Sequence, residues 1–355
     1  MTHRLKPAVV VAPASADGVR AARMEDVAAA AGVSMKTVSR VFNREPNVRE
    51  ATRSRVEQIA RQLNYQPNTS ARSLAANRSY LVALLYDNPS SNYVMEVIDG
   101  VLDACRNAHY NLMLRPIDYT GAGHVEAVAE LVAQYRPDGL VLTPPLTDDR
   151  ALLERLQRLG VRHASLSARP GNAQLGASLN ERRAAAEMLE HVVALGHRRI
   201  GHITGHRDHG ARAWRLAGYR DGLRRAGIEF DPALVIEGEH TFHSGVEGAR
   251  RLLGLADPPT ALFAANDDMA AGVIYEACER GLRIPDDLSV LGFDDTPLSQ
   301  QIWPGLTTVR QPSRDMGRIA AEQLLLEIRG TGTGQVVQVP YQLQLRRSLG
   351  PARQP

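Results

Sequence analysis

The chain has little cysteine, few aromatic residues and no long apolar run. Its only cysteines, Cys105 and Cys278, lie in helix-like patterns, so the sequence implies no disulfide framework and favours a reduced, cytoplasmic protein. No stretch approaches the roughly 20 apolar residues that span a bilayer. Nucleophile elbows, phosphate-binding loops, kinase motifs and paired-carboxylate signatures are also missing from the sequence. These absences argue against a membrane protein and against an enzyme, and no cofactor is predicted.

The N-terminal residues only partly imitate an export signal. A basic start precedes a short apolar run, residues 8–12, which is bracketed by Pro7 and Pro13. A secretory signal needs about 7–15 apolar residues, more than this run provides. We therefore interpret residues 1–22 as a disordered tail.

Positive charge is concentrated in the first part of the chain. Residues 1–79 carry 13 Lys and Arg against 6 Asp and Glu, whereas residues 80–355 carry 29 against 33. At 355 residues the chain is also too long for one compact core, which suggests two or three domains. A basic head on a mildly acidic body is typical of a nucleic-acid-binding module joined to a second function.

Residues 23–67 have the pattern of an all-α helix-turn-helix domain. Apolar residues at helical spacing begin at Met24 and stop at Gly32, a residue suited to the left-handed conformation that ends a helix. Ser34 can then cap a second helix, which we expect to extend to about Asn43. In such domains the second helix lies in the major groove of DNA. We expect the side chains of Met35, Lys36 and Arg40 to read bases. Thr37 and Ser39 are better placed to contact phosphates.

A third helix and a short hinge helix are predicted next. The third helix covers residues 50–64, and its arginine-rich face either contacts DNA or is simply solvated. Residues 68–75 form a potential helix with a cap, Asn68, and one large apolar side chain, Leu74. So short a helix is only marginally stable in water, so we expect it to fold when it docks on another surface. Residues 68–79 are therefore assigned to a hinge helix and linker.

Motifs in this region resemble the lactose/galactose-repressor family of bacterial transcriptional regulators. Residues 33–41 (VSMKTVSRV) are followed by 65–68 (YQPN) and 71–74 (ARSL), and the resemblance extends over the chain beyond the N-terminal tail. It implies that the hinge helix folds on DNA and inserts Leu74 into the minor groove as an apolar wedge; packing of Leu74 against the body is the alternative. The DNA contacts that it implies are Ser34, Met35, Lys36, Thr37, Ser39, Arg40, Asn43, Asn68, Ala71, Arg72 and Leu74.

Residues 80–355 alternate strand patterns with helical patterns, which argues for parallel sheets in an α/β fold. Strands are predicted at 81–86, 111–115, 139–143, 163–166, 200–204, 234–238, 261–265 and 289–293. Helices are predicted between them, for example at 94–108, 125–135, 151–159, 184–195, 211–225 and 269–280. We expect a two-lobed, periplasmic-binding-protein-like body for effector binding and dimerisation. One lobe would comprise about 80–178 and 309–338, and the other about 179–308 and 339–350.

Polar side chains follow two of the predicted strands. Ligands of open α/β sheets bind outside the carboxyl ends of the strands, and Asn266 and Asp294 each follow such an end. Their oxygens can accept hydrogen bonds from sugar hydroxyls. Helix capping is the alternative for these positions, above all for the neighbouring Asp267 and Asp268. Arg215 leads the apolar face of a helix, and its guanidinium can bind two neighbouring hydroxyls. The resemblance implies effector contacts for Arg215, Asn266 and Asp294.

Aromatic residues, on which sugar rings stack, make up 5% of the chain. By analogy with the family, Tyr93, Phe242 and Trp303 face the cleft, although each could be ordinary packing. The histidine-rich run 202–209 invites a metal interpretation, but zinc requires four ligands and no cysteine lies nearby. No metal is predicted, and His206 and His209 either contact a ligand or belong to a surface loop.

These features predict a DNA-binding transcriptional regulator, with repression of carbohydrate-utilisation genes as the expected role. We expect a homodimer on a near-palindromic operator, because two-fold protein symmetry implies two-fold DNA symmetry. A mono- or oligosaccharide would control DNA affinity allosterically. The alternatives are the same architecture responding to a nucleobase or nucleoside, and a sugar-binding module without a DNA function.

Overall fold

The computed structural model describes residues 22–42, 47–65, 78–169 and 171–353. The chain divides into two compact units, residues 1–78 and 79–355. Several predictions lie outside the described residues: the tail before residue 22, the hinge helix, and the DNA contacts Asn43, Asn68, Ala71, Arg72 and Leu74.

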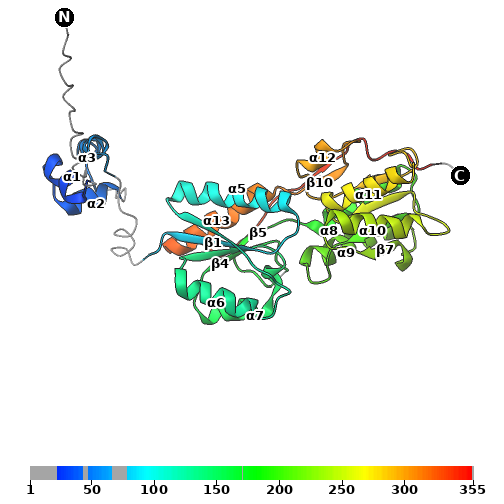
Figure 1. Cartoon of the computed structure of the whole chain (residues 1–355), viewed down its shortest axis with the longest axis horizontal. Coiled ribbons are helices and arrows are strands. Elements are labelled where there is room, and N and C mark those ends of the chain that lie inside the picture. The colour runs from blue at the N-terminus through cyan, green and yellow to red at the C-terminus, as the bar shows by residue number, and fades with distance from the viewer. Residues whose placement is uncertain (1–21, 43–46, 66–77, 170, 354–355) are drawn as a thin grey trace, which may run out of the picture. The chain divides into compact units, whose positions relative to one another are not determined.

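The described part of the first unit is a helix-turn-helix with a third helix packed on it (Figure 1). Its helices are α1 (Met24–Ala31), α2 (Met35–Phe42) and α3 (Glu50–Gln62). Gly32 ends α1 in the left-handed conformation with a φ of 63°, as the sequence predicts. The Thr37 N–H donates to Ser34 Oγ over 3.1 Å, so Ser34 caps α2. A small core holds the helices together: Val27, Ala28, Ala31, Val38, Val41, Val56, Ala60 and Tyr65.

The second unit contains two parallel sheets, which confirms the predicted α/β class (Figure 1). The first sheet has the order β11-β5-β4-β3-β1-β2 and the second has the order β7-β6-β8-β9. Strands of the first sheet are β1 (Leu81–Tyr86), β2 (Asn111–Pro116), β3 (Gly139–Leu142), β4 (His163–Leu166), β5 (Gly176–Ser178) and β11 (Val336–Gln338). Strands of the second are β6 (Ile200–Thr204), β7 (Val235–Glu237), β8 (Ala261–Ala264) and β9 (Ser289–Leu291).

Helices cover both faces of each sheet, and the central strands β1, β3, β6 and β8 are accordingly buried on both sides. In the first lobe α5 (Ser91–Ala108) and α13 (Ser313–Arg329) lie on one face, and α6 (His124–Tyr135) and α7 (Arg150–Arg158) lie on the other (Figure 1). Alternate residues of β1 serve the two faces: Val82 packs with α5 and α13, and Ala83 packs with α6 and α7. The helices of the second lobe pair as α8 (Glu181–Ala194) with α9 (Gly210–Arg225), and α10 (Phe242–Leu253) with α11 (Asp267–Glu279).

All eight predicted strands are confirmed, and the strands missing from the prediction are short. The observed α5, α8 and α11 begin two or three residues before the predicted helices. The three-residue strands β5, β10 (Thr308–Arg310) and β12 (Gln342–Gln344) were not predicted. Strand β5 exists because it pairs with β4 and β11, and β10 exists because it pairs with β12. Strands this short carry too few alternating residues to stand out in a sequence.

None of the helices in the described ranges combines the length and the apolarity needed to cross a membrane.

Candidate functional site

The exposed face of α2 carries the side chains predicted to read DNA. Met35 is 51% exposed, and Lys36 and Arg40 are also exposed, whereas Val38 and Val41 on the opposite side are buried. Thr37 and Ser39 are half-buried. The hydroxyls of Ser34 and Thr37 lie 2.9 Å apart, so these two side chains also stabilise the start of the helix. The structure thus groups the described members of the predicted DNA-contact set on α2 and on its capping residue, Ser34.

The arginine-rich face of α3 is not uniformly solvated. Arg53 Nη1 donates to the Val41 carbonyl over 3.2 Å and ties α3 to the end of α2. Arg55 and Arg61 are exposed. Arg53 therefore has a structural role. Of the three arginines, Arg55 and Arg61 are the ones whose side chains are exposed to solvent, where they could contact DNA.

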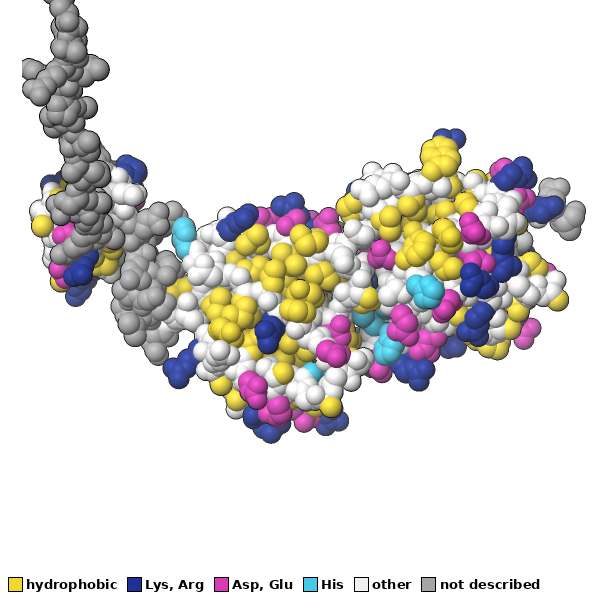
Figure 2. Space-filling view, viewed as in Figure 1, with side chains coloured by type: hydrophobic (Ala, Val, Ile, Leu, Met, Phe, Trp, Pro, Cys, Tyr) yellow, Lys and Arg dark blue, Asp and Glu magenta, His cyan; other side chains and the backbone are white. Residues whose placement is uncertain are grey.

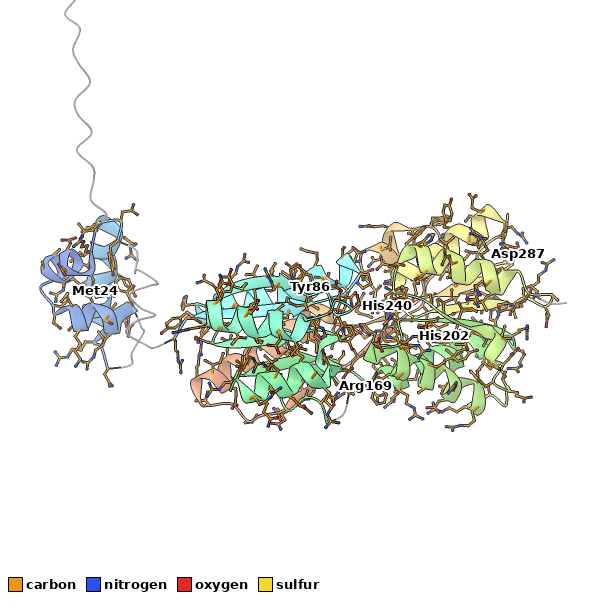
Figure 3. All side chains as sticks on the ribbon, turned by 60° about the horizontal axis from the view of Figure 1, so that its bottom comes forward. Met24, Tyr86, Arg169, His202, His240 and Asp287 are labelled. Carbon is orange, nitrogen blue, oxygen red and sulfur yellow. The ribbon has the colours of Figure 1, made fainter. Side chains whose placement is uncertain are left out.

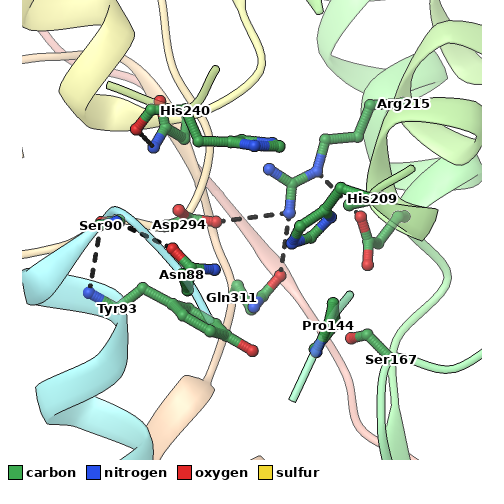
Figure 4. Close-up of a pocket in the computed structure, with 13 residues that line it drawn as sticks. Asn88, Ser90, Tyr93, Pro144, Ser167, His209, Arg215, His240, Asp294 and Gln311 are labelled. Atoms are coloured by element: carbon green, nitrogen blue, oxygen red, sulfur yellow. Dashed lines mark hydrogen bonds and ion pairs between the residues drawn. The ribbon is translucent and has the colours of Figure 1, made fainter. Parts of the chain in front are cut away.

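A cavity lies between the two lobes of the second unit, and we call it the central cavity (Figure 4). Its lining comes mainly from segments that follow the carboxyl ends of strands in both sheets, where ligands of α/β folds bind. The residues that line it are Asn88, Ser90, Tyr93, Pro144, Ser167, Glu181, His209, Ala211, Arg215, His240, Asn266, Asp294 and Gln311. Four predicted effector contacts, Tyr93, Arg215, Asn266 and Asp294, are thus brought together.

Arg215 is the centre of a buried polar network in this cavity. Its Nε donates to Glu181 Oε2 over 2.9 Å, and Nη1 donates to the Ala265 carbonyl. Nη2 lies 3.5 Å from Asp294 Oδ1 and 3.3 Å from Gln311 Oε1. The guanidinium carbon also lies 3.7 Å above the centre of the Phe293 ring, a cation–π contact. Two of the four polar contacts are long, so the Nη2 group is the part of this guanidinium most easily transferred to a ligand.

Asp294 is strongly influenced by its surroundings. Its backbone is left-handed, with a φ of 111°, and its side chain is buried beside Arg215. Burial raises the pKa of Asp294 well above its ordinary value, and the Arg215 guanidinium opposes that rise. A carboxyl in this position is sensitive to any ligand that alters its contact with Arg215.

The residues of the acidic segment after β8, 266–268, have different roles, which the sequence alone did not assign. Asn266 caps α11, because its Oδ1 accepts from the Met269 N–H over 2.9 Å, and its Nδ2 donates to the His240 carbonyl. Asp267 instead accepts from the Thr308 hydroxyl over 2.6 Å and from the Thr296 N–H over 2.7 Å, so it ties loops together. Burial raises the pKa of Asp267 to about 7.

Asp268 bridges the two lobes. Its carboxylate accepts hydrogen bonds from the Ser90 hydroxyl and from Asn92 Nδ2, the latter over 3.4 Å. Ser90 and Asn92 belong to the first lobe, at the start of α5, whereas Asp268 is in the first turn of α11 in the second lobe. This contact holds the lobes together in the conformation seen here.

Two histidines face each other in the central cavity. His209 and His240 are 9% and 4% exposed, and their ring centres lie 4.6 Å apart (Figure 4). Both ring nitrogens of His209 and Nε2 of His240 have no hydrogen-bond partner among the described residues. Burial lowers the pKa of His209 to about 3, and it lowers the pKa of His240 well below its usual value. Both rings are therefore neutral at physiological pH, and each can both donate and accept.

The other histidines of the 202–209 run have different surroundings. His202 is fully buried between Tyr219 and Phe263, with Nδ1 2.8 Å from the Phe263 carbonyl (Figure 3 labels His202 and His240). His206 lies near the surface, 3.7 Å from Asp208. Histidine and acidic side chains lie close together on the visible surface near the junction of the lobes (Figure 2). Within the described ranges, however, no group of three or more such side chains is placed to hold a metal ion.

Two predicted effector contacts lie elsewhere. Phe242 begins α10, is 45% exposed and packs edge-on against Tyr275, with ring centres 5.7 Å apart. Trp303 is 74% exposed, with the Arg347 guanidinium 4.9 Å from its ring centre. Neither lines the central cavity. This conformation does not bring either side chain to the predicted site, because a loop position fixes neither the direction of a side chain nor its partners.

Sequence reasoning missed several residues that line the cavity. Ser167 and His240 follow β4 and β7, and Glu181 begins α8. Each follows a strand or begins a helix, so the strand-end rule that selected Asn266 could have selected Ser167 and His240 as well. Nothing in the local sequence distinguishes Glu181 or Gln311, because their role depends on Arg215 reaching them.

An α-helical DNA-binding head joined to two parallel-sheet lobes with a polar cavity between them is the architecture of a ligand-responsive regulator. Family models match at both ends of the chain: "Bacterial regulatory proteins, lacI family" over residues 23–68, and "Periplasmic binding protein-like domain" over residues 189–349. Catabolite control protein A of Priestia megaterium is 31% identical over 91% of this chain and 98% of its own length.

Solved structures agree with the family models. The transcriptional regulator CelR in complex with cellobiose has 31% identity and a TM-score of 0.71, and the match covers 92% of this chain and 99% of that one. The lac repressor dimer bound to operator and the anti-inducer ONPF has 30% identity and a TM-score of 0.77, and the match covers 92% of this chain and 98% of that one. The chain belongs to the lacI family of bacterial regulatory proteins. It is a DNA-binding transcriptional regulator and not an enzyme.

Proposed function

We propose that this protein is a repressor of carbohydrate-utilisation genes whose operator affinity is set by a small, uncharged sugar in the central cavity. The observation that carries the proposal is the group of unpartnered, buried polar atoms there: Ser167 Oγ, both ring nitrogens of His209, and His240 Nε2. Native proteins leave few such atoms without a partner. A ligand rich in hydroxyl groups, each of which donates and accepts, would supply the missing hydrogen bonds.

The charges of the cavity favour a neutral ligand over a phosphate or a carboxylate. Arg215 is the cation of the lining, and it is paired with Glu181 and lies beside Asp294. An anionic ligand would have to compete with these two carboxylates, and the neutral histidines add no positive charge. A hydroxyl, by contrast, can accept from the Nη2 group of Arg215 and donate to Asp294 without unbalanced charge. The relative CelR, solved with cellobiose, also supports a sugar.

Binding requires the lobes or the lining side chains to move. The central cavity has a volume of about 20 Å³ in this conformation, room for about one water molecule, whereas ligand pockets typically measure about 300–1,000 Å³. Opening would break the contact of Asp268 with Ser90, which joins the lobes. A sugar that binds one arrangement of the lobes better than the other would shift the equilibrium between them. That shift is the basis that we propose for allosteric control.

The proposed DNA contact is made by α2, through Lys36 and Arg40 on its exposed face, and by the hinge segment, including Leu74. Two heads of a homodimer would each read one half of a near-palindromic operator. The lac repressor, a relative solved as a dimer on its operator, supports this arrangement. A repressor must reach operator DNA inside the cell, so the proposed function implies a cytoplasmic protein.

A thermal-shift screen tests the effector class. The panel contains monosaccharides, disaccharides, sugar phosphates, nucleobases and nucleosides. A ligand at 100 times its Kd stabilises the protein by about 2.7 kcal/mol, which is easily measured. We expect neutral sugars alone to raise the Tm. A shift produced only by nucleobases or only by sugar phosphates would contradict the proposal.

Two variants then connect the ligand to operator binding. Asp294→Asn should retain operator affinity and lose most of the effector response, because an amide nitrogen, which only donates, replaces a carboxyl oxygen that can accept from the sugar. Asp286→Asn, an exposed carboxylate in the same lobe, is the matched control and should respond normally. Operator affinity measured by fluorescence anisotropy with and without the sugar also shows whether the ligand releases the protein from DNA or recruits it.

A further inference from the structure

A second cavity, which we call the side cavity, adjoins the central cavity. It has a volume of about 220 Å³, about ten times that of the central cavity, and Ser167 and Glu181 line both. Its walls come from the end of β4, from the chain between β5 and α8, and from α9, which contributes Trp214. A ligand in the central cavity that extends past Ser167 and Glu181 would therefore enter the side cavity.

Trp214 and Arg215 are neighbours on α9 and serve different cavities. Consecutive residues of an α-helix point about 100° apart, and here Arg215 lines the central cavity while Trp214 lines the side cavity. An indole ring offers a broad apolar face with one polar edge, and such faces pack against the C–H surface of sugar rings. The side cavity thus offers a second aromatic wall, in addition to Tyr93 in the central cavity.

The polar groups around Trp214 are already paired within the protein. Arg182 Nε lies 2.6 Å from Asp221 Oδ2, and Gln338 Nε2 donates to Ser178 Oγ over 2.7 Å. The Asp221 carboxylate thus balances the charge of Arg182, so this arginine does not favour a phosphate in the cavity. The Ser167 hydroxyl is the exception: it is 6% exposed, has no hydrogen-bond partner among the described residues, and lies where the two cavities meet.

We propose that the two cavities hold successive rings of one oligosaccharide, which makes the effector a disaccharide or longer. This inference rests on the proposed sugar effector and goes further, because it assigns a second ring to Trp214. The first ring binds among His209, His240 and Arg215, and the second ring packs on the indole. The Ser167 hydroxyl bonds to the oxygens near the glycosidic link.

Tryptophan fluorescence can test this proposal directly, because the chain contains only two tryptophans, Trp214 and Trp303. In Trp303→Phe, which alters an exposed side chain outside both cavities, all indole emission comes from Trp214. Full-length Trp303→Phe protein is titrated with cellobiose, maltose, lactose and trehalose, and separately with glucose and galactose. We expect at least one disaccharide to change the emission of Trp214 and to bind about tenfold or more tightly than its constituent monosaccharide.

The ratio of monosaccharide Kd to disaccharide Kd, measured in Trp214 variants, completes the test. Trp214→Ala should reduce the preference for the disaccharide to within about threefold while leaving the Kd of the monosaccharide nearly unchanged. Trp214→Phe should keep an intermediate preference, and it serves if the alanine variant fails to fold, as judged by its melt and its operator binding. A disaccharide preference that is equal in wild type and in the Trp214 variants overturns the second ring site. If monosaccharides bind and no disaccharide binds better, the sugar function stands and this inference fails. If no sugar of either kind binds, both fail.

Discussion

Arg215 allows the sharpest test of how the cavity is held together. Replacing it with Met keeps most of the volume of the side chain but leaves Glu181 and Asp294, which are 4% and 8% exposed, without the cation that pairs with them here. Removing one partner of a buried ion pair costs about 3–5 kcal/mol, since the other charge stays buried without compensation. For a unit of this size each kcal/mol corresponds to about 2–4 °C in Tm. We therefore expect Arg215→Met to melt roughly 10 °C below wild type.

The pH dependence of that loss has a defined sign. Burial already raises the pKa of Asp294, and Arg215 opposes the rise, so removing Arg215 raises this pKa further. The native state then binds a proton that the unfolded chain, with an ordinary aspartate, releases above about pH 4. Because the native state binds more protons, the free energy of unfolding falls as the pH rises. Arg215→Met should thus be more destabilised relative to wild type at pH 8 than at pH 5.

Calorimetry or urea denaturation of the full chain measures both effects. The matched control is Arg225→Met, which removes a surface pair with Glu190 in which both side chains are about half exposed; such pairs contribute about 0–1 kcal/mol. Adding Glu181→Gln and Asp294→Asn to Arg215→Met should restore much of the lost stability. If Arg215→Met melts within about 2 °C of wild type, or if its loss is the same at both pH values, this account of the network is refuted.

Three further predictions concern the DNA-binding head. Arg40→Ala should weaken operator binding about tenfold, whereas Arg251→Ala, on the surface of the second lobe, should not; anisotropy titrations with equal affinities for the two would contradict the assignment of α2. Leu74→Ala should lose more specific than non-specific affinity, because an apolar wedge acts where the DNA is bent; equal losses on operator and random DNA would exclude the wedge. The logarithm of operator affinity should fall linearly with the logarithm of salt concentration, because the basic head releases counterions, and a flat dependence would argue against phosphate contacts.

Helix ends, strand bounds and the residues that follow strands could be predicted from the sequence, because each depends on residues that are close together in the chain. Gly32 and Ser34 define the turn of the head, because ending one helix and capping the next depend only on nearby backbone groups. Strands β1, β4 and β6 have the predicted bounds, since each is a short, largely buried run between turn residues. The strand-end rule likewise assigns Asn266 and Asp294 to a ligand site, and both line the central cavity.

Which side chains meet is set instead by the packing of distant segments. His240 faces His209, and Gln311 reaches Arg215, from segments that are 31 and 96 residues apart in the chain. Asp267 and Asp268 are adjacent and look alike in sequence, yet one ties loops together within its lobe and the other joins the two lobes. Trp303 lies on the surface while Trp214 lines a cavity. Periodicity reports how a segment meets the core, but the partner of a buried polar group is fixed only when distant segments pack, and that packing defines the site.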